Sequence, residues 1–401
     1  MEIEIKPSIA KGVIAAPPSK SFAHRFLICG ALSHGQSKVH GISESDDMKA
    51  TIGCLSSLGA KVQSQGDTVT ISGGLNPKKE VMLDCIESGS TLRFMIPVAL
   101  ASGAEKITFK GSERLVARGV EVYEQTFENR GITFEKGKDY ITVKGQLESG
   151  KYVLRGDVSS QYVSGLMLAL AMLNKDSEIE ILPPVESRPY IDLTVATLAK
   201  FGVKIEEISQ NTFFVKGGQT FQNGEYKVEG DWSNGAILLA LDSFGSHVEV
   251  TGLDQNSVQG DKACVEIFRA LEKENAVIDL SNCPDLAPIA FAVAAEKNGA
   301  TFVGTERLKI KESDRAAVMA QELAKCGAQV EVKENCVVVK KRDLHSPSQT
   351  LLSHNDHRIA MSLAVLITKY GGQINGAEAV KKSYPNFWSD IKGVGTNVYE
   401  I

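Results

Sequence analysis

Positively charged side chains stand near the predicted starts of several apolar helices. Arg25 follows the PPSKS turn, Arg93 lies in ESGSTLRF, and Arg358 lies in NDHRIA. Arg315 follows the cap candidate Ser313 in KIKESDR. A helix start carries free N–H groups and a partial positive charge, so a cation there costs about 1 kcal/mol or less. Several such violations together indicate function, because a bound anion reconciles them; phosphate is the leading candidate and carboxylate the second.

The segment PPSKSFAHR has the densest set of such groups. Ser21 and Arg25 are four residues apart and share a helical face, as do Lys20 and His24. One helical turn can therefore present a hydroxyl, an ammonium and a guanidinium group. The apolar run FLICGAL that follows favours a buried helix over a solvated amphipathic one.

The sequence lacks the usual motifs for nucleotides and metals. No G-x-x-x-x-G-K-[ST] segment occurs, which argues against a P-loop. No H-E-x-x-H motif or dense group of metal ligands occurs, and the histidine of NDHR is better interpreted as structural. The 7 cysteines are scattered without a C-x-x-C pair, which indicates reduced core thiols. We expect no metal site.

The elements that would position these cations recur six times with a period of about 70 residues. Each repeat begins with a polar residue before an apolar helix. About forty residues later a turn residue, suited to a left-handed helix end, precedes alternating apolar residues. The interval between the fourth and fifth repeats is short, which suggests an abbreviated connection. The helix markers are Ser21, Ser90, Ser160, Ser233, Asp285 and Asp356, and the turn residues are Gly59, Gly131, Gly202, Asn275, Gly327 and Gly395.

These repeats predict an α/β (α+β) chain of two similar domains with three repeats each. The 401 residues, 43% of them hydrophobic, are enough for two cores. We expect a first domain over residues 15–228 and a second over 229–401, completed by the N-terminal strand 1–14. The helices that start each repeat are apolar nearly all round and should be interior. Ser19 or Ser21, Ser88, Ser159, Asp231 and Asp285 are the predicted caps.

The net charge and the hydropathy of the chain argue against a nucleic-acid-binding, membrane-spanning or secreted protein. The formal net charge of -5 gives no global attraction to nucleic acid or to an anionic membrane. No apolar run reaches the roughly 18 residues of a membrane span, and the start MEIEIKPSIAKG lacks a signal-peptide core. A cytoplasmic enzyme or binding protein with a concentrated anion site is expected.

Seven motifs resemble the EPSP (5-enolpyruvylshikimate-3-phosphate) synthase family: PPSKSFAHR, SGSTLRF, SSQYVSGL, ESRPYIDLT, KIKESDR, HNDHRIAM and KKSYPNFW. The resemblance implies two domains of three βαβαββ units each, an inside-out α/β barrel, with the active site in the cleft between domains. It implies transfer of the enolpyruvyl group of phosphoenolpyruvate to the 5-hydroxyl of shikimate 3-phosphate, with release of phosphate. It further implies no cofactor or metal, a monomer, small anionic substrates as partners, and inhibition by glyphosate at Gly89.

The resemblance also suggests residue roles. Asp285 is similar to the carboxylate that contacts the attacking hydroxyl, Glu312 to the one near the methylene carbon, and Lys20 to an acid or charge-stabilising group. Phosphoenolpyruvate would contact Lys20, Gly89, Arg114, Gln161, Arg315, Arg358 and Lys382. Shikimate 3-phosphate would contact Lys20, Ser21, Arg25, Ser159, Ser160, Gln161, Ser187, Tyr190, Asp285 and Lys311.

Three residues depart from the family pattern. Glu87 stands where Asn is common, Phe94 where Pro is common, and Arg307 where some members have Asn. Glu87 adds a negative charge near an anion site, so we expect it to face away or to pair with a cation. The role of Arg307 stays open.

Three other functions fit the sequence less well. UDP-N-acetylglucosamine enolpyruvyl transferases typically carry a loop Cys, and GSERLVARGVEVYEQ has none. An RNA 3'-phosphate cyclase finds no support in the scattered histidines and acidic net charge. A catalytically silent binding module is disfavoured because Lys20, Asp285, Glu312 and Arg358 are all present.

Overall fold

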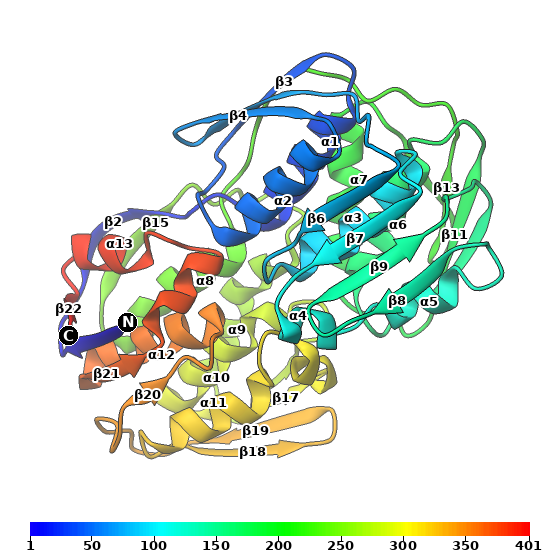
Figure 1. The fold of residues 1–401 in the computed structure, drawn as a ribbon. Coiled ribbons are helices and arrows are strands. Elements are labelled where there is room, and N and C mark those ends of the chain that lie inside the picture. The colour runs from blue at the N-terminus through cyan, green and yellow to red at the C-terminus, as the bar shows by residue number, and fades with distance from the viewer. The chain divides into compact units, whose positions relative to one another are not determined.

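The computed structural model describes residues 1–401, which divide into two compact units (Figure 1). One unit is the continuous segment Pro18–Glu229, and the other combines Met1–Pro17 with Gly230–Ile401. Each unit has its own hydrophobic core. None of the helices meets the length and apolarity needed to cross a lipid bilayer.

Three four-stranded sheets in Pro18–Glu229 share one pattern, in which the first two strands are parallel and the last two form an antiparallel hairpin. Apolar residues alternate along most strands, so one face of each sheet packs on the core. The sheet orders are β14 (Glu225–Lys227), β3 (Gln36–His40), β5 (Thr68–Ser72), β4 (Lys61–Gln65); β6 (Glu80–Asp84), β7 (Lys106–Lys110), β9 (Tyr140–Lys144), β8 (Thr133–Lys136); and β10 (Lys151–Arg155), β11 (Ser177–Leu182), β13 (Thr212–Val215), β12 (Ile205–Ser209).

The other unit has two sheets with the same order of parallel and antiparallel pairs, one of them ending in a pair that is not a hairpin, and one shortened sheet. N-terminal strands complete two of its sheets. The orders are β16 (Val277–Asp279), β17 (Gly299–Val303), β19 (Cys336–Lys340), β18 (Gln329–Lys333); β20 (Leu351–Leu352), β21 (Gly372–Asn375), β1 (Glu2–Lys6), β22 (Asn397–Glu400); and the pair β15 (His247–Thr251) and β2 (Lys11–Ala15).

The two-stranded pair explains the short interval between the fourth and fifth repeats. After α9 (Cys264–Leu271) the chain turns at Asn275 directly into β16, which is already the first strand of the next sheet. The fourth repeat therefore has no hairpin of its own, and the predicted abbreviation is confirmed.

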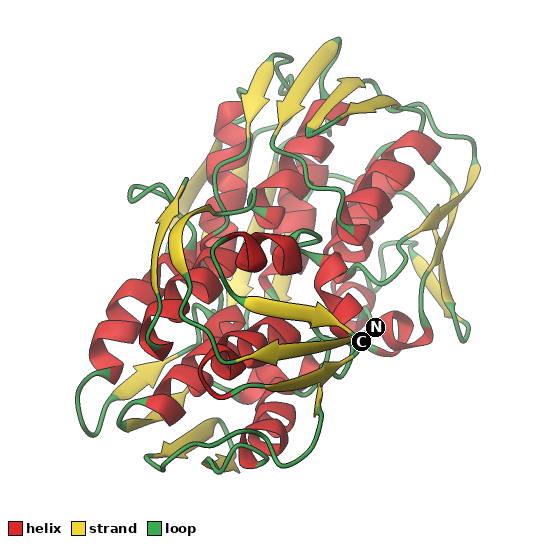
Figure 2. Cartoon of the chain, turned by 90° about the vertical axis from the view of Figure 1, so that its left-hand side faces the viewer, coloured by secondary structure: helices red, strands yellow, loops and turns green.

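The helix that opens each repeat is buried on nearly all sides, as predicted. In α10, every residue from Ala287 to Ala295 is buried. In Figure 2 the helices are red, and many of the yellow strands lie outside them. The buried helices are α1 (Lys20–Leu32), α3 (Gly89–Ala101), α6 (Ser160–Leu170), α8 (Trp232–Leu239), α10 (Ala287–Glu296) and α12 (His357–Tyr370); the others are α2 (Asp46–Ser57), α4 (Glu113–Ala117), α5 (Glu121–Thr126), α7 (Arg188–Lys200), α9, α11 (Arg315–Ala324) and α13 (Phe387–Gly393).

All six predicted turn residues adopt the left-handed conformation after a helix and before a strand. Glycine reaches this conformation without the steric penalty that Cβ imposes, and asparagine tolerates it. The φ angles are 101° at Gly59, 70° at Gly131, 77° at Gly202, 56° at Asn275, 89° at Gly327 and 100° at Gly395.

Two of the predicted helix caps are wrong. Asp285 lies in the short 3₁₀ turn before α10 and caps no helix through its side chain. The residue that caps α11 is Asp314, which accepts from the amide of Ala317, and Ser313 is not the cap. Both errors arise because carboxylate and hydroxyl groups suit caps and ion pairs equally well. The predicted caps Ser19, Ser88, Ser159 and Asp231 do accept amide hydrogen bonds.

Candidate active site

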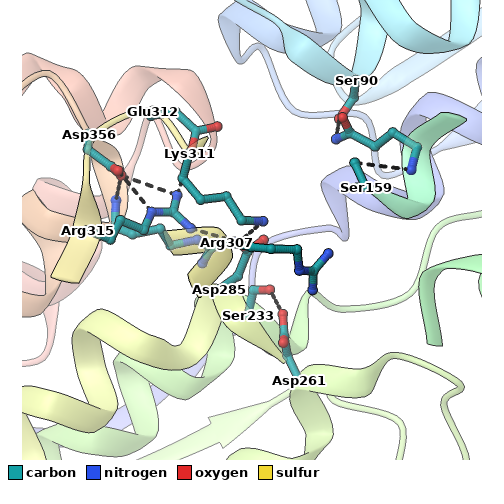
Figure 3. A network of polar contacts seen from close by, with 12 residues as sticks. Ser90, Ser159, Ser233, Asp261, Asp285, Arg307, Lys311, Glu312, Arg315 and Asp356 are labelled. Carbon is teal, nitrogen blue, oxygen red and sulfur yellow. Dashed lines mark hydrogen bonds and ion pairs between the residues drawn. The ribbon is translucent and has the colours of Figure 1, made fainter. Parts of the chain in front are cut away.

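In the unit that contains Gly230–Ile401, the start of α11 places one buried guanidinium among three carboxylates (Figure 3). Arg315 has a side chain only 1% exposed. Its Nη1 donates to Oδ1 of Asp285 at 2.7 Å and its Nη2 to Oε2 of Glu312 at 2.8 Å. Its Nε donates to Oδ2 of Asp356 at 2.9 Å. Arg315 therefore orients carboxylates from three separate segments.

The Asp285 carboxylate stays ionised although it is largely shielded from solvent, with a side chain 23% exposed. Burial alone would raise its pKa, but Lys311, Arg315 and Arg358 outweigh burial and hold the pKa well below the usual range. Lys311 Nζ lies 3.2 Å from Asp285 Oδ1, and burial lowers the pKa of this lysine in spite of Asp285. Asp285 is thus an ionised acceptor held among cations.

The start of α12 carries a buried arginine, Arg358, beside the carboxylate of Asp356, which caps the helix. Asp356 caps the helix by accepting from the amide of Arg358 at 2.9 Å. Arg358 Nη1 donates to Oδ1 of Asn234 at 3.0 Å, whereas its buried Nε has no hydrogen-bond partner. Buried polar groups are normally satisfied, so an unsatisfied guanidinium nitrogen at a helix start is suited to an anionic ligand.

A buried carboxyl that the sequence reasoning missed lies in the same unit. Asp261 accepts a hydrogen bond from the hydroxyl of Ser233. Burial, and then the charge of Asp285, raise the pKa of Asp261 to about 6. Asp261 sits in the short fourth repeat, in the 3₁₀ turn η2 (Gly260–Ala263) that leads into α9, and not at the start of a helix that opens a repeat.

Two further cations of this unit bind backbone carbonyls. Lys382 Nζ donates to the Asn355 carbonyl at 2.7 Å, at the loop before α12. The buried Arg307, whose role the sequence left open, donates through Nη2 to the Ser281 carbonyl at 2.9 Å.

In the unit Pro18–Glu229, the start of α1 presents Lys20 and Arg25. Lys20 Nζ lies 2.7 Å from Oδ2 of Asp47, and both side chains are mostly buried. Ser19 caps the helix and Ser21 lies within its first turn. The Ser21 carbonyl accepts from Arg25 Nη1 at 2.7 Å.

The buried side chain of Arg25, on α1, forms hydrogen bonds with residues of α6 and α7. Its Nε donates to Thr194 Oγ1 at 2.7 Å, and its Nη2 to Ser164 Oγ and to the Tyr190 carbonyl, each at 3.1 Å. Burial lowers the pKa of Arg25 to about 9. The guanidinium carbon lies 4.8 Å from the ring centre of Phe94, so this departure from the family pattern supplies a cation–π contact.

Gln161, in the first turn of α6, links the starts of α3 and α6. Its Oε1 accepts from Arg93 Nη1 at 2.7 Å and its Nε2 donates to Ser90 Oγ at 2.9 Å. The backbone N–H of Gln161 donates to Oγ of the cap residue Ser159 at 3.3 Å. Ser160, between them, is buried. The Gln161 side chain thereby connects the start of α3 with the start of α6.

Gly89 lets two guanidinium groups approach the start of α3. A Cβ at this position would lie 3.1 Å from Nη1 of Arg93 and 3.1 Å from Nη1 of Arg118. We expected Arg114 here; the structure instead leaves Arg114 exposed on α4 and brings Arg118, at the end of that helix, beside Gly89. The two arginines are four residues apart on one helix, so spacing alone did not distinguish them.

The remaining predicted residues lie around α7 and before α3. Ser187 is buried and left-handed, with φ 54°, directly before α7. Tyr190 faces Arg25 through its carbonyl, as described above. Glu87 accepts from Ser112 Oγ at 3.2 Å, which ties the segment before α3 to α4.

The acidic residues do not form a metal site. No group of three or more His, Cys, Asp and Glu side chains in residues 1–401 is arranged to hold a metal ion. Arg315 occupies the centre of the one dense carboxylate cluster described above. The arrangement is therefore suited to anionic ligands, ionised carboxylates and proton transfer.

Comparison with known proteins gives one consistent result. The model of the EPSP synthase (3-phosphoshikimate 1-carboxyvinyltransferase) family matches residues 5–391. The 3-phosphoshikimate 1-carboxyvinyltransferase of Clostridium kluyveri is 41% identical over 99% of this chain and 98% of its own length. The protein of the same name from Clostridium acetobutylicum is 40% identical over 99% and 98%.

Solved structures confirm the predicted fold class. EPSP synthase from Acinetobacter baumannii matches with a TM-score of 0.81 at 23% identity, over 99% of both chains. The enolpyruvyl transferase NikO from Streptomyces tendae matches with a TM-score of 0.80 at 12% identity, over 99% of this chain and 98% of its own. The chain thus has the two-domain inside-out α/β fold.

Proposed function

The chain belongs to the EPSP synthase (3-phosphoshikimate 1-carboxyvinyltransferase) family, and on that premise we propose that it transfers the enolpyruvyl group of phosphoenolpyruvate to the 5-hydroxyl of shikimate 3-phosphate. The observation that carries the mechanism is the pairing of Arg315 with both Asp285 and Glu312. One guanidinium orients the two carboxylates that the reaction needs. The family match favours this function over UDP-N-acetylglucosamine enolpyruvyl transfer.

The charges of the clusters suit the substrates. Each phosphate carries about -1.5 to -2 charges at neutral pH, and each substrate adds a carboxylate. We assign Lys20, Arg25, Ser21, Ser159, Ser160, Gln161, Ser187, Tyr190 and Lys311 to shikimate 3-phosphate. For phosphoenolpyruvate we assign Lys20, Gly89, Gln161, Arg315, Arg358 and Lys382, and we replace Arg114 by Arg118 together with Arg93, because these two converge on Gly89.

The proposed addition begins at the 5-hydroxyl. Its oxygen attacks C2 of phosphoenolpyruvate while the hydroxyl proton passes to Asp285, whose ionised state suits an acceptor. Glu312 must enter this step as the protonated acid; it gives its proton to C3, which becomes a methyl group. The new bond joins the 5-oxygen to C2.

The proposed elimination reverses the proton transfer at C3. Glu312 takes a proton back from C3 and the bond between C2 and the phosphate oxygen breaks. The proton that Asp285 took from the 5-hydroxyl leaves with the phosphate, so both carboxyl groups return to their starting states. Lys20 stabilises the departing negative charge. No step draws on a metal or an organic cofactor. We further propose that the protein is a cytoplasmic monomer that binds no nucleic acid, with domains at residues 15–228 and at 229–401 completed by 1–14.

Phosphate release from the purified protein tests the proposal. We expect release to require both phosphoenolpyruvate and shikimate 3-phosphate, and to persist with a metal chelator. UDP-N-acetylglucosamine in place of shikimate 3-phosphate should give none. Activity with that acceptor alone would contradict the assignment, whereas a strict need for added divalent metal would contradict only the mechanism.

A further inference from the structure

Four buried side chains form a continuous hydrogen-bonded chain through the unit Pro18–Glu229, which we name the hydroxyl relay: His24, Thr51, Thr91 and Ser88. His24 Nδ1 lies 2.7 Å from Thr51 Oγ1, which lies 2.8 Å from Thr91 Oγ1. Thr91 Oγ1 donates to Ser88 Oγ at 2.8 Å. All four residues are at most 2% exposed. The relay therefore runs from α1 through α2 to the cap of α3 and is shielded from solvent along its length.

Counting protons fixes the direction of the relay. A hydroxyl has one proton to donate. The Thr91 hydroxyl donates its hydrogen bond to Ser88, so it must accept the hydrogen bond that it shares with Thr51. The Thr51 hydroxyl therefore donates to Thr91, so it must accept the hydrogen bond from Nδ1 of His24. Ser88 accepts a second hydrogen bond, from the Thr91 amide at 3.2 Å, which is the cap of α3.

This direction requires a neutral His24 with its proton on Nδ1. The other nitrogen, Nε2, is buried and has no hydrogen-bond partner, and the ring packs edge-on against Phe94 with centroids 6.1 Å apart. A second proton would bury an unsatisfied N–H group. Burial, Lys20 and Arg25 accordingly lower the pKa of His24 well below its usual value.

The ends of the relay carry groups assigned to the two substrates. The His24 end belongs to α1, next to Lys20 and Arg25, and the Ser88 end directly precedes Gly89. We propose that His24 and Thr51 are positioning residues, which fix the start of α3 relative to α1 so that both anion-binding sets keep one geometry. This inference rests on the proposed function. Neither residue contacts substrate; each acts through Ser88 and α1.

Substitutions at Thr51 test the proposal with matched controls. Thr51→Val keeps the shape and removes the hydroxyl, whereas Thr51→Ser keeps the hydroxyl. Thr197→Val is the control for losing a buried hydroxyl elsewhere, because Thr197 Oγ1 only donates to the Leu193 carbonyl of its own helix, at 2.9 Å. We expect Thr51→Val to raise KM for phosphoenolpyruvate roughly two- to thirtyfold and to lower kcat by less.

Thr51→Ser and Thr197→Val should keep both constants near those of the natural protein. Equal KM values for Thr51→Val and Thr197→Val would overturn the proposal. So would failure of Thr51→Ser to restore KM. An inactive natural protein would instead contradict the proposed function, and the relay would then be judged by the measurement that follows.

The tautomer of His24 can be measured without activity and without a folded Thr51 variant. Nitrogen NMR of the natural protein labelled in histidine, with His24→Asn to assign the signal, should show a neutral ring protonated on Nδ1 at pH 7. A neutral ring protonated on Nε2 would overturn the relay, because Thr51 would then have no donor. A ring protonated on both nitrogens would keep that donor but would overturn the neutral state inferred for His24.

Discussion

Arg315 Nη1 and Asp285 Oδ1 are joined by a 2.7 Å hydrogen bond within a buried cluster. Three carboxylates share this guanidinium, so replacing Arg315 would remove their common partner, although Lys311 would still lie 3.2 Å from Asp285. Breaking a buried ion pair in this way costs about 3 to 5 kcal/mol. Loss of activity in an Arg315 variant would therefore combine chemistry with folding, and Asp285 is the cleaner position for a test.

Asp285→Asn should lower kcat by roughly a hundred- to ten-thousandfold, because the amide cannot take the hydroxyl proton. The variant keeps an oxygen that can accept from Arg315, so the fold should persist. Steady-state phosphate release measures kcat. Asp279→Asn is the matched control, since Asp279 accepts only a backbone hydrogen bond, from Ser281 at 2.8 Å, within the same unit. Equal rates in the two variants would remove Asp285 from the mechanism.

Arg118→Ala should lower kcat/KM for phosphoenolpyruvate much more than Arg114→Ala. Loss of a charge-assisted contact in a desolvated site costs about 2 to 5 kcal/mol, or roughly thirty- to several-thousandfold. The exposed Arg114 lies on the same short helix, which makes it a close control. The reverse order of effects would restore the residue that the sequence favoured.

Gly89→Ala should weaken the inhibitor glyphosate more than it weakens phosphoenolpyruvate. The new methyl group would press on the guanidinium ends of Arg93 and Arg118, each 3.1 Å away, and the longer inhibitor tolerates their displacement less. Competitive inhibition titrations on both proteins give Ki and KM. Equal factors in the two constants would show that the extra length of glyphosate does not reach this glycine.

Asp261→Asn should be more favourable for the stability of its unit at pH 7 than at pH 4, compared with the natural protein at each pH. The folded-state pKa of about 6 lies above the unfolded value, so Asp261 stabilises the fold below about pH 4 and that stability is lost as pH rises through 6. The free energy of unfolding of the variant, minus that of the natural protein, should therefore increase by at most about 3 kcal/mol between pH 4 and pH 7.

Urea unfolding followed by tryptophan fluorescence measures this difference. Both tryptophans, Trp232 and Trp388, belong to the same unit as Asp261, so the signal reports that unit alone. Asp343→Asn, an exposed position in the same unit, is the control. A difference that does not change between pH 4 and pH 7 would show that folding does not raise the pKa of Asp261.

The repeat and its turns were predictable because they depend on local chemistry. Gly59 and Asn275 occupy equivalent turns and both are left-handed, which glycine and asparagine tolerate. The abbreviated repeat was visible as a short interval. These features need no knowledge of what lies across the fold.

The cluster details were not predictable because they depend on long-range contacts. Arg114 and Arg118 are equivalent by spacing, and only the direction of the short helix α4 brings Arg118 to Gly89. Asp261 and Asp285 lie in different repeats, and their mutual effect on pKa requires the folded unit. Ser313 fits a cap in sequence, yet its hydroxyl donates to Asp356, 3.0 Å away.

The pairing of β1 with β21 and β22 also sets an order of assembly on the ribosome. The segment Pro18–Glu229 can complete all three of its sheets as soon as it has emerged. β1 is made before the segment Pro18–Glu229 and its partners are made after it, so the edges of β1 stay unpaired while that segment is synthesised. Nascent chains should therefore protect the amides of α1 from exchange long before those of Ile3 and Ile5, and a stalled ribosome would leave that first strand available to chaperones.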